Sequence, residues 1–209
     1  MKSLVNIERG LKRISLNDII KKEEKFMKKN LGAKTWLYPM PVLIVATYNE
    51  DRSPNAMNAA WGGIAEENRI SICIDDSHKT YENLALNQAF TVGIADSENV
   101  VSCDYVGVVS GKKVKDKFTK AGFTATPSEF IKAPIIDQLK MTLECKVIKI
   151  DECSVLGEIV NVCADESILT DGKVDVSKLQ PITYDPMNHH YLVLGEKVGN
   201  AFHDGKALK

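Results

Sequence analysis

Residues 42–62 read VLIVATYNEDRSPNAMNAAWG, and this stretch decides the fold class of the chain. Its first seven residues are rich in β-branched side chains, which is typical of a strand. The next seven, NEDRSPN, form turns readily, and a second extended stretch follows from Ala56 to Gly62. The pattern therefore predicts an antiparallel hairpin with a long tip.

Further extended runs follow this hairpin along the chain. The sequence predicts strands at residues 69–74, 89–95, 141–150 and 154–165. The last two alternate apolar and polar residues and meet at the turn DECS, so they form a second antiparallel hairpin. A polar insert at 166–188 then carries turn signals at Asp171-Gly172 and Asp185-Pro186.

Helical patterns are short and lie between the strands. They cover residues 78–88, 98–105 and 115–121. The first of them places Tyr81, Leu84 and Ala85 on one helical face. Strands dominate without the βαβ rhythm of a Rossmann fold, so we expect a mainly β fold class, an antiparallel β-barrel with peripheral α-helices.

The first 34 residues differ from the rest of the chain. They are rich in lysine, and their apolar residues recur at roughly helical intervals from about Ser15 onward. We expect residues 1–34 to form an amphipathic helical arm and residues 35–209 to form the main domain. Because Glu23 and Glu24 interrupt the basic face, the arm is expected to pack on the body or on a partner subunit rather than on a membrane.

The composition of the 209-residue chain excludes several functional classes. Its 27 basic and 28 acidic side chains nearly cancel, which argues against nucleic-acid or membrane binding. Five widely spaced cysteines, with no C-x-x-C and no histidine pair at the spacing that zinc needs, predict neither a disulfide framework nor a metal site. Cys73, Cys145 and Cys163 are expected to be buried and inert. With no long apolar run, we expect a cytoplasmic protein.

The segment Ser77-His78-Lys79-Thr80 joins a strand to a helix that opens near Lys79. Ser77 is the expected N-cap residue. Unpaired amides at a helix start, together with the Lys79 ammonium and the hydroxyls of Ser77 and Thr80, suit a phosphate group. The alternative is that Ser77 only caps the helix and Lys79 is a solvated surface charge.

The stretch NAMNAAWGG at 55–63 is unusual for a strand because nearly all of its side chains are small. Small side chains leave the backbone open to a flat, hydrogen-bonding ring laid against the strand. The alternative is close packing against a neighbouring element, with Trp61 in the core. Motifs for a nucleophile with its base, a P-loop and a dinucleotide fingerprint are absent, so hydrolase and kinase functions lack support.

In their order and spacing, these pieces resemble the flavin reductase-like family of FMN-binding split barrels, and most closely its flavoredoxin-type members. The resemblance spans about residues 34–207. It is carried by YPMPVLIVATY (38–48), NAMNAAWGG (55–63), SHKTYEN (77–83), AFTVGI (89–94), DYVGVVSG (104–111), LEC (143–145), YLVLG (191–195) and AFHDGK (201–206). Two positions depart from it: Asn58 stands where relatives carry a small hydroxyl residue, and Asp51-Arg52-Ser53 where they carry glycine.

The resemblance implies that residues 35–209 form an antiparallel split β-barrel that binds FMN. In such proteins the strand matching Met57 to Trp61 lies beside the flavin ring and ribityl chain, and the segment matching Ser77 to Thr80 holds the phosphate. The cofactor-binding residues it implies are Met57, Asn58, Ala59, Ala60, Trp61, Ser77, His78, Lys79, Thr80 and Asn83. It also implies a homodimer with the flavin near the interface.

The function implied is that of an FMN-binding oxidoreductase of the flavin reductase type, which takes reducing equivalents from NAD(P)H. The flavin carries the chemistry, so no catalytic side chain is assigned. The alternatives are a flavoredoxin-like electron carrier that uses a redox protein partner without NAD(P)H, and a flavin-binding module without turnover. Loss of Lys79 is expected to weaken FMN binding roughly tenfold or more. Flavin contacts from Tyr191, Phe202 or the second subunit stay open.

Overall fold

The computed structural model describes residues 28–209. The unit formed by Trp36–Lys209 contains every strand described below. Most of the predicted N-terminal arm, residues 1–34, lies outside the described residues. Its last part, residues 28–34, contains no helix or strand. The helical arm and its boundary with residues 35–209 therefore stay predictions.

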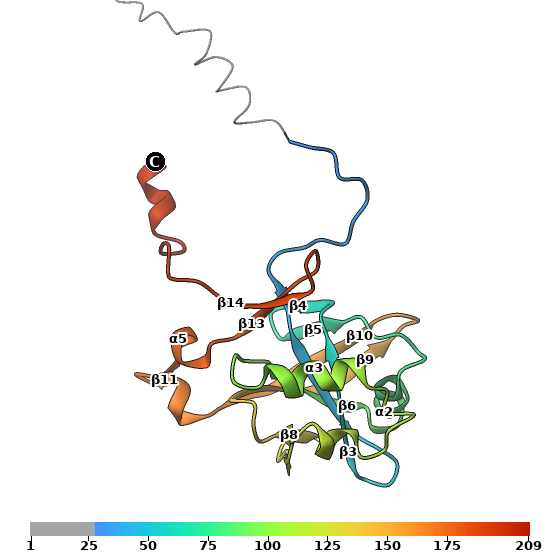
Figure 1. Ribbon diagram of the computed structural model, residues 1–209. Coiled ribbons are helices and arrows are strands. Elements are labelled where there is room, and N and C mark those ends of the chain that lie inside the picture. The colour runs from blue at the N-terminus through green and yellow to red at the C-terminus, as the bar shows by residue number, and fades with distance from the viewer. Residues whose placement is uncertain (1–27) are drawn as a thin grey trace, which may run out of the picture. The chain divides into compact units, whose positions relative to one another are not determined.

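A curled, seven-stranded antiparallel sheet forms the body of the molecule (Figure 1). Its strands are, in spatial order, β3 (Pro54–Ala59), β2 (Leu43–Tyr48), β6 (Ala89–Ile94), β9 (Met141–Ile150), β10 (Val155–Ala164), β5 (Arg69–Ile72) and β4 (Gly62–Glu66). Every neighbouring pair is antiparallel, and β9 and β10 form the predicted hairpin. The mainly β, split-barrel fold class is confirmed.

The two edge strands of this sheet are joined by only Ala60 and Trp61, so the sheet must curl until its edges meet at that corner. The predicted strand Ala56–Gly62 is therefore wrong at its end: β3 stops at Ala59 and the chain crosses to β4. Gly62 makes the crossing sterically possible, because a Cβ there would lie 2.8 Å from the Ser71 carbonyl oxygen. This corner lies in the stretch 55–63, which was expected to lie beside the flavin ring.

Strand β2 is buried on both faces, which explains why its sequence is an unbroken apolar run. Leu43 and Val45 pack inside the barrel with Phe90, whereas Ile44 and Ala46 pack against the helices outside it. The run at 42–48 thus joins the two main hydrophobic clusters of the described chain.

Three helices lie next to the sheet. They are α2 (Lys79–Asn87), α3 (Val100–Val108) and α4 (Lys117–Lys120), and α3 runs across the strands in Figure 1. The predicted helices at 78–88, 98–105 and 115–121 are confirmed. The expected buried face of the first is partly wrong, because Ala85 is exposed. Thr80 and Asn83 are buried beside Leu84 instead, since α2 makes polar contacts with the β2–β3 hairpin.

Smaller elements complete the described chain. They are β1 (Met40–Pro41), β7 (Ala125–Pro127), β8 (Pro134–Ile136), η1 (Glu166–Ile168), β11 (Leu169–Thr170), β12 (Lys173–Val174), α5 (Val176–Leu179), β13 (Ile182–Asp185), β14 (His190–Val193) and η2 (Asp204–Leu208). Asp171 and Gly172 have φ values of 52° and 72°, which confirms the predicted turn. Arg52, one of the three hairpin-tip residues that depart from the resemblance, also has a positive φ of 68°.

The cysteines confirm the prediction only in part. Cys145 is buried, and burial raises the pKa of its thiol to about 12, so it is inert as predicted. Cys163 is half-buried, and Cys73 is exposed, which contradicts its prediction. Cys73 follows the end of β5 and faces away from the core that Ile72 and Ile74 enter. Among the described residues, no helix has the length and apolar character needed to cross a membrane.

Candidate functional site

The start of α2 carries unsatisfied backbone donors. The predicted cap is wrong, because His78 rather than Ser77 occupies the N-cap position and no side chain caps the helix. Ser77 belongs to the preceding turn, where its N–H donates to Asp75 Oδ1 at 2.9 Å. The first amides of a nine-residue helix thus lack a side-chain acceptor, which is the condition that favours anion binding.

A cavity of about 250 Å³ lies at this helix start. It brings together six of the ten predicted cofactor-binding residues, namely Met57, Asn58, Ser77, His78, Lys79 and Thr80. Val106 to Gly111 and Lys117 form the rest of its lining. Of these described lining residues, none carries a carboxylate, whereas two are lysines. We call this space the small cavity.

Two glycines bring the end of α3 and the following loop close to β3. A Cβ on Gly107 would lie 3.0 Å from Asn58 Cβ, and a Cβ on Gly111 would lie 2.6 Å from Asn55 Oδ1. Asn55 is buried and donates from Nδ2 to Thr80 Oγ1 at 3.0 Å. Gly111 therefore closes the small cavity from one side, while Asn55 fixes Thr80 on the other.

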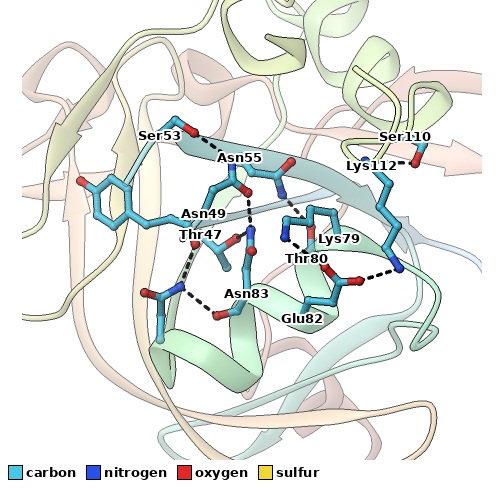
Figure 2. A network of polar contacts seen from close by, with 12 residues as sticks. Thr47, Asn49, Ser53, Asn55, Lys79, Thr80, Glu82, Asn83, Ser110 and Lys112 are labelled. Carbon is cyan, nitrogen blue, oxygen red and sulfur yellow. Dashed lines mark hydrogen bonds and ion pairs between the residues drawn. The ribbon is translucent and has the colours of Figure 1, made fainter. Parts of the chain in front are cut away.

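Lys79 takes part in a surface ion cluster (Figure 2). Glu82 accepts from Lys79 Nζ at 3.0 Å and from Lys112 Nζ at 2.7 Å, and these two bonds lower the pKa of the Glu82 carboxyl. Glu82 is therefore ionised at neutral pH and shares its charge between both lysines. We call Lys79, Glu82 and Lys112 the surface cluster.

Lys117 contributes a second cation to the small cavity, and it is only 4% exposed. Its Nζ donates to the Val106 and Val109 carbonyl oxygens at 3.0 and 2.9 Å, at the C-terminal end of α3. Burial lowers the pKa of Lys117 to about 8. The two lysines of the cavity thus have opposite surroundings, because one is in contact with a carboxylate and water and the other with carbonyl groups in the interior.

Asn83 does not line the small cavity. Its Nδ2 donates to Thr47 Oγ1 at 3.1 Å and to Asn49 Oδ1 at 2.8 Å, which fixes α2 to the end of β2 (Figure 2). The structure therefore gives Asn83 a role in orienting α2. Direct contact between Asn83 and a cofactor stays a prediction.

A second cavity, of about 410 Å³, shares Asn58 and Gly107 with the small cavity. Its further lining residues are Val42, Ala60, Asp104, Tyr184, His189 and Tyr191. We call it the aromatic cavity. The two cavities therefore adjoin at Asn58 and Gly107.

A tyrosine hydroxyl is held in the aromatic cavity. Tyr191 donates to Asp104 Oδ1 at 2.8 Å, while Asn58 Nδ2 lies 3.5 Å from the Tyr191 oxygen and donates to the Cys103 carbonyl at 3.1 Å. Burial, and then the bond to Asp104, raise the pKa of Tyr191, so its hydroxyl is protonated at neutral pH. Beside it, the Tyr184 and Tyr191 ring centroids are 5.9 Å apart. This end of the site offers flat apolar surface and fixed polar groups.

The other predicted site residues of the stretch 55–63 do not line the small cavity. Ala60 lines the aromatic cavity, Ala59 is buried in the barrel core, and Trp61 is 56% exposed at the corner of the sheet. The alternative for this stretch is therefore wrong in placing Trp61 in the core, but its close packing is present, because Ala56 and Ala59 are buried. Phe202 lies on the exposed C-terminal segment.

Comparison with known proteins agrees with this geometry. The family described as "Flavin reductase like domain" matches residues 35–191. The chain belongs to the flavin reductase-like family. The resemblance found in the sequence is thus confirmed, over a range that contains both the barrel and the residues of the two cavities.

Solved structures of the flavin reductase-like family and its relatives share the fold. The flavoredoxin of Desulfovibrio vulgaris (Miyazaki F) is 38% identical, covers 86% of this chain and all of its own, and superimposes with a TM-score of 0.83. The flavoredoxin of Methanosarcina acetivorans is 29% identical, with coverages of 88% and 100% and a TM-score of 0.80. An FMN-binding domain of a flavin reductases-like enzyme from Shewanella baltica, 17% identical with coverages of 77% and 88%, shares the fold at a TM-score of 0.69.

Sequence reasoning did not identify several site residues. Gly107 and Gly111 carried a readable signal, because a glycine, which has no Cβ, allows close approach to a neighbouring strand. Lys117 carried none, since it lies in a lysine-rich stretch where each residue looks like a surface charge. Only the tertiary fold distinguishes it from Lys113 and Lys115.

Proposed function

We propose that the chain binds FMN non-covalently and passes reducing equivalents through it. The observation that carries the proposal is the uncapped start of α2, which opens on a cavity with two lysines and no carboxylate among its described lining residues. A phosphate monoester matches such a site in charge and in hydrogen bonding.

The adjoining aromatic cavity fits the rest of the ligand. Asn58 and Gly107 form walls of both cavities, so a molecule with a phosphate at one end and a flat ring at the other matches the lining chemistry. Gly107 leaves room beside Asn58 because it has no Cβ. The Shewanella baltica relative, whose fold this chain shares, is itself described as FMN-binding.

The residues of this chain bind and orient rather than react. When bound, FMN supplies the hydride and electron chemistry. Ser77 to Thr80 would hold the phosphate, and Asn58 and Ala60 would border the ring. Tyr191 donates its proton to Asp104, so its oxygen stays in the aromatic cavity as a fixed acceptor.

We propose NAD(P)H as the reductant, as in a flavin reductase. A second function is favoured by the 38% identity to a flavoredoxin over the full length of that chain. In that case the protein is an electron carrier that exchanges electrons with a redox protein partner and does not use NAD(P)H.

We also propose that two copies form a homodimer that completes the ring end of the site. Three apolar side chains are exposed: Val108, which lines the small cavity, at 76%, Trp61, which follows Ala60 in sequence, at 56%, and Val101 of α3 at 84%. Exposed apolar surface of this kind marks an interaction site. Sedimentation of the FMN-loaded protein should give a dimer, and a monomer at micromolar concentration would contradict this part of the proposal.

Two measurements test the function. First, the purified protein should quench FMN fluorescence on titration, and no quenching would overturn the proposal. Second, the FMN-loaded protein is mixed anaerobically with NADH, with NADPH, and with a reduced ferredoxin. Rapid bleaching of flavin absorbance by a nicotinamide supports the reductase, whereas bleaching by ferredoxin alone supports the carrier.

A further inference from the structure

Lys117 is a buried cation that forms no ion pair within residues 28–209. Its Nζ donates to two backbone carbonyls, those of Val106 and Val109. An ammonium carries three N–H donors, so these two bonds leave one donor for another acceptor. Lys117 is only 4% exposed to solvent, yet it forms part of the wall of the small cavity.

The carbonyl contacts compensate the charge only in part. The C-terminal end of a helix is equivalent to roughly half a negative charge, and α3 ends at Val108 beside Lys117. Burial of an ion without a full counter-charge is costly. The lowered pKa of Lys117, about 8, reflects that cost.

The other residues that line the small cavity are neutral or positive. The titratable groups that line the small cavity with Lys117 are His78 and Lys79 from the start of α2, and its own segment carries Asp116 and Lys120. Asp116 pairs with Lys120 at 3.2 Å on the exposed side. Strand β3 and helix α3 present Met57, Asn58 and backbone carbonyls. The small cavity therefore has an excess of positive charge that a bound anion would balance.

We propose that Lys117 donates to the phosphate of FMN and makes the chain select phosphorylated flavin over riboflavin. The inference rests on the proposed function and deepens it. Lys117 combines two tasks: it caps the C-terminal end of α3 and presents the remaining donor of its ammonium to the ligand. In this arrangement the phosphate lies between the uncapped amides of α2 and the ammonium at the end of α3.

A purely structural role gives a different expectation. If Lys117 only caps α3, its loss destabilises the fold and weakens FMN and riboflavin binding equally. If it binds the phosphate, its loss weakens FMN alone, because riboflavin has the same ring and ribityl chain without the phosphate. The ratio of the two affinities therefore separates the two roles.

The first experiment compares Lys117→Met with Lys120→Met, which removes the same charge from an exposed position of the same short helix. Each protein is titrated with FMN and with riboflavin at pH 7. Lys117→Met should weaken FMN binding about tenfold or more and change riboflavin binding by less than about twofold. Lys120→Met should leave both unchanged. An unaltered affinity ratio in Lys117→Met would overturn the inference.

The second experiment uses wild-type protein, so it does not depend on the folding of the Lys117 variant. Titration calorimetry at pH 9 in two buffers of different ionisation enthalpy measures the protons taken up on binding. Binding of FMN should be accompanied by the uptake of close to one proton by the protein, because Lys117 is mostly neutral at pH 9 before binding. Binding of riboflavin should be accompanied by none. The phosphate is already a dianion there, since its second pKa is about 6.

The outcomes distinguish this inference from the proposed function. The uptake should persist in Lys79→Met, which excludes the other lysine of the cavity as its source. Absence of uptake with FMN would overturn the role of Lys117 while leaving FMN binding in place. Failure of the wild-type protein to bind either flavin would overturn the proposed function, and this inference with it.

Discussion

Lys79 and Lys117 line the same small cavity but stand in different surroundings. Lys79 lies at the surface, where Glu82 accepts from it and also from Lys112. Lys117 is buried against carbonyl oxygens, and no carboxylate of the described part of the chain pairs with it. Because electrostatic interactions are stronger away from water, the buried ammonium should contribute more to anion binding. The contribution of each lysine to anion binding therefore depends on its burial and not on whether it belongs to the segment Ser77 to Thr80.

The cavities show the same contrast. A larger space of about 760 Å³ lies on the outer side of Lys79 and Gly111. Its lining includes the acidic residues Glu50, Asp51, Glu82 and Asp116. A phosphate would meet both signs of charge there, whereas the small cavity offers amides and cations. Size alone would select the wrong cavity for an anion.

The largest effect is expected at Gly111, which lines both the small cavity and the larger one. In Gly111→Ala the new Cβ would lie 2.6 Å from Asn55 Oδ1, which is buried and fixes Thr80. We expect a loss of about 1–3 kcal/mol of stability from the forced displacement. Calorimetric melting should show a Tm lower by roughly 2–12 °C, together with weakened FMN binding.

Gly63→Ala is the matched control for this change. No atom outside its chain neighbours lies within 4 Å of a Cβ built there. Its Tm should therefore stay close to that of the wild type. Equal melting temperatures for both variants would show that the close approach between β3 and the loop after α3 does not depend on Gly111.

The next effect concerns pH and sharpens the contrast between the lysines. The free protein has a Lys117 pKa of about 8, and a bound phosphate favours the charged form. The affinity that Lys117 contributes is thus present below about pH 8 and lost above it. Between pH 7.5 and 9.5, FMN affinity relative to riboflavin should fall by about 10- to 30-fold. Lys117→Arg should abolish this dependence, because arginine stays charged. A flat profile in the wild type would assign the phosphate to other groups.

The sequence predicted most of the fold because its signals were local. The run at 42–48, the DECS hairpin and the short helices each depend on neighbouring residues, and all of them are confirmed. The end of β3 was not predicted, because Ala60 and Trp61 are extended in pattern but lie at a corner fixed by the closure of the sheet. Curling is a property of seven strands together.

The site was predictable to the extent that it is continuous in sequence. Ser77 to Thr80 form one segment, and the structure places all four around the small cavity. Lys117 and Gly111 reach it through the packing of α3 and α4 on β3, which no local pattern encodes. The predicted burial of Cys73 and of Ala85 was wrong for a related reason, because side-chain direction near the end of a strand or on a short helix depends on tertiary contacts.

A smaller effect is expected at the surface. The sequence alone suggested a roughly tenfold loss for Lys79→Met, but Glu82 already neutralises much of that charge in the structure. Exposed ion pairs contribute little, so FMN affinity should fall by only about two- to fivefold. Lys112→Met, which also loses a bond to Glu82 but does not line the small cavity, is the control. A loss for Lys79→Met as large as that for Lys117→Met would break the comparison.

The smallest effect, and the one with the opposite sign, belongs to Glu82→Gln. Since the bonds from Lys112 and Lys79 lower the pKa of this carboxyl, Glu82 is charged at pH 7 and competes with a phosphate for Lys79. Removal of the charge should tighten FMN binding by about two- to threefold at low salt, and the gain should vanish near 1 M salt because exposed charges are screened. Titrations at two ionic strengths measure this. If FMN binding weakens instead, Glu82 positions Lys79 for the ligand, and the surface cluster belongs to the phosphate site as fully as Lys117.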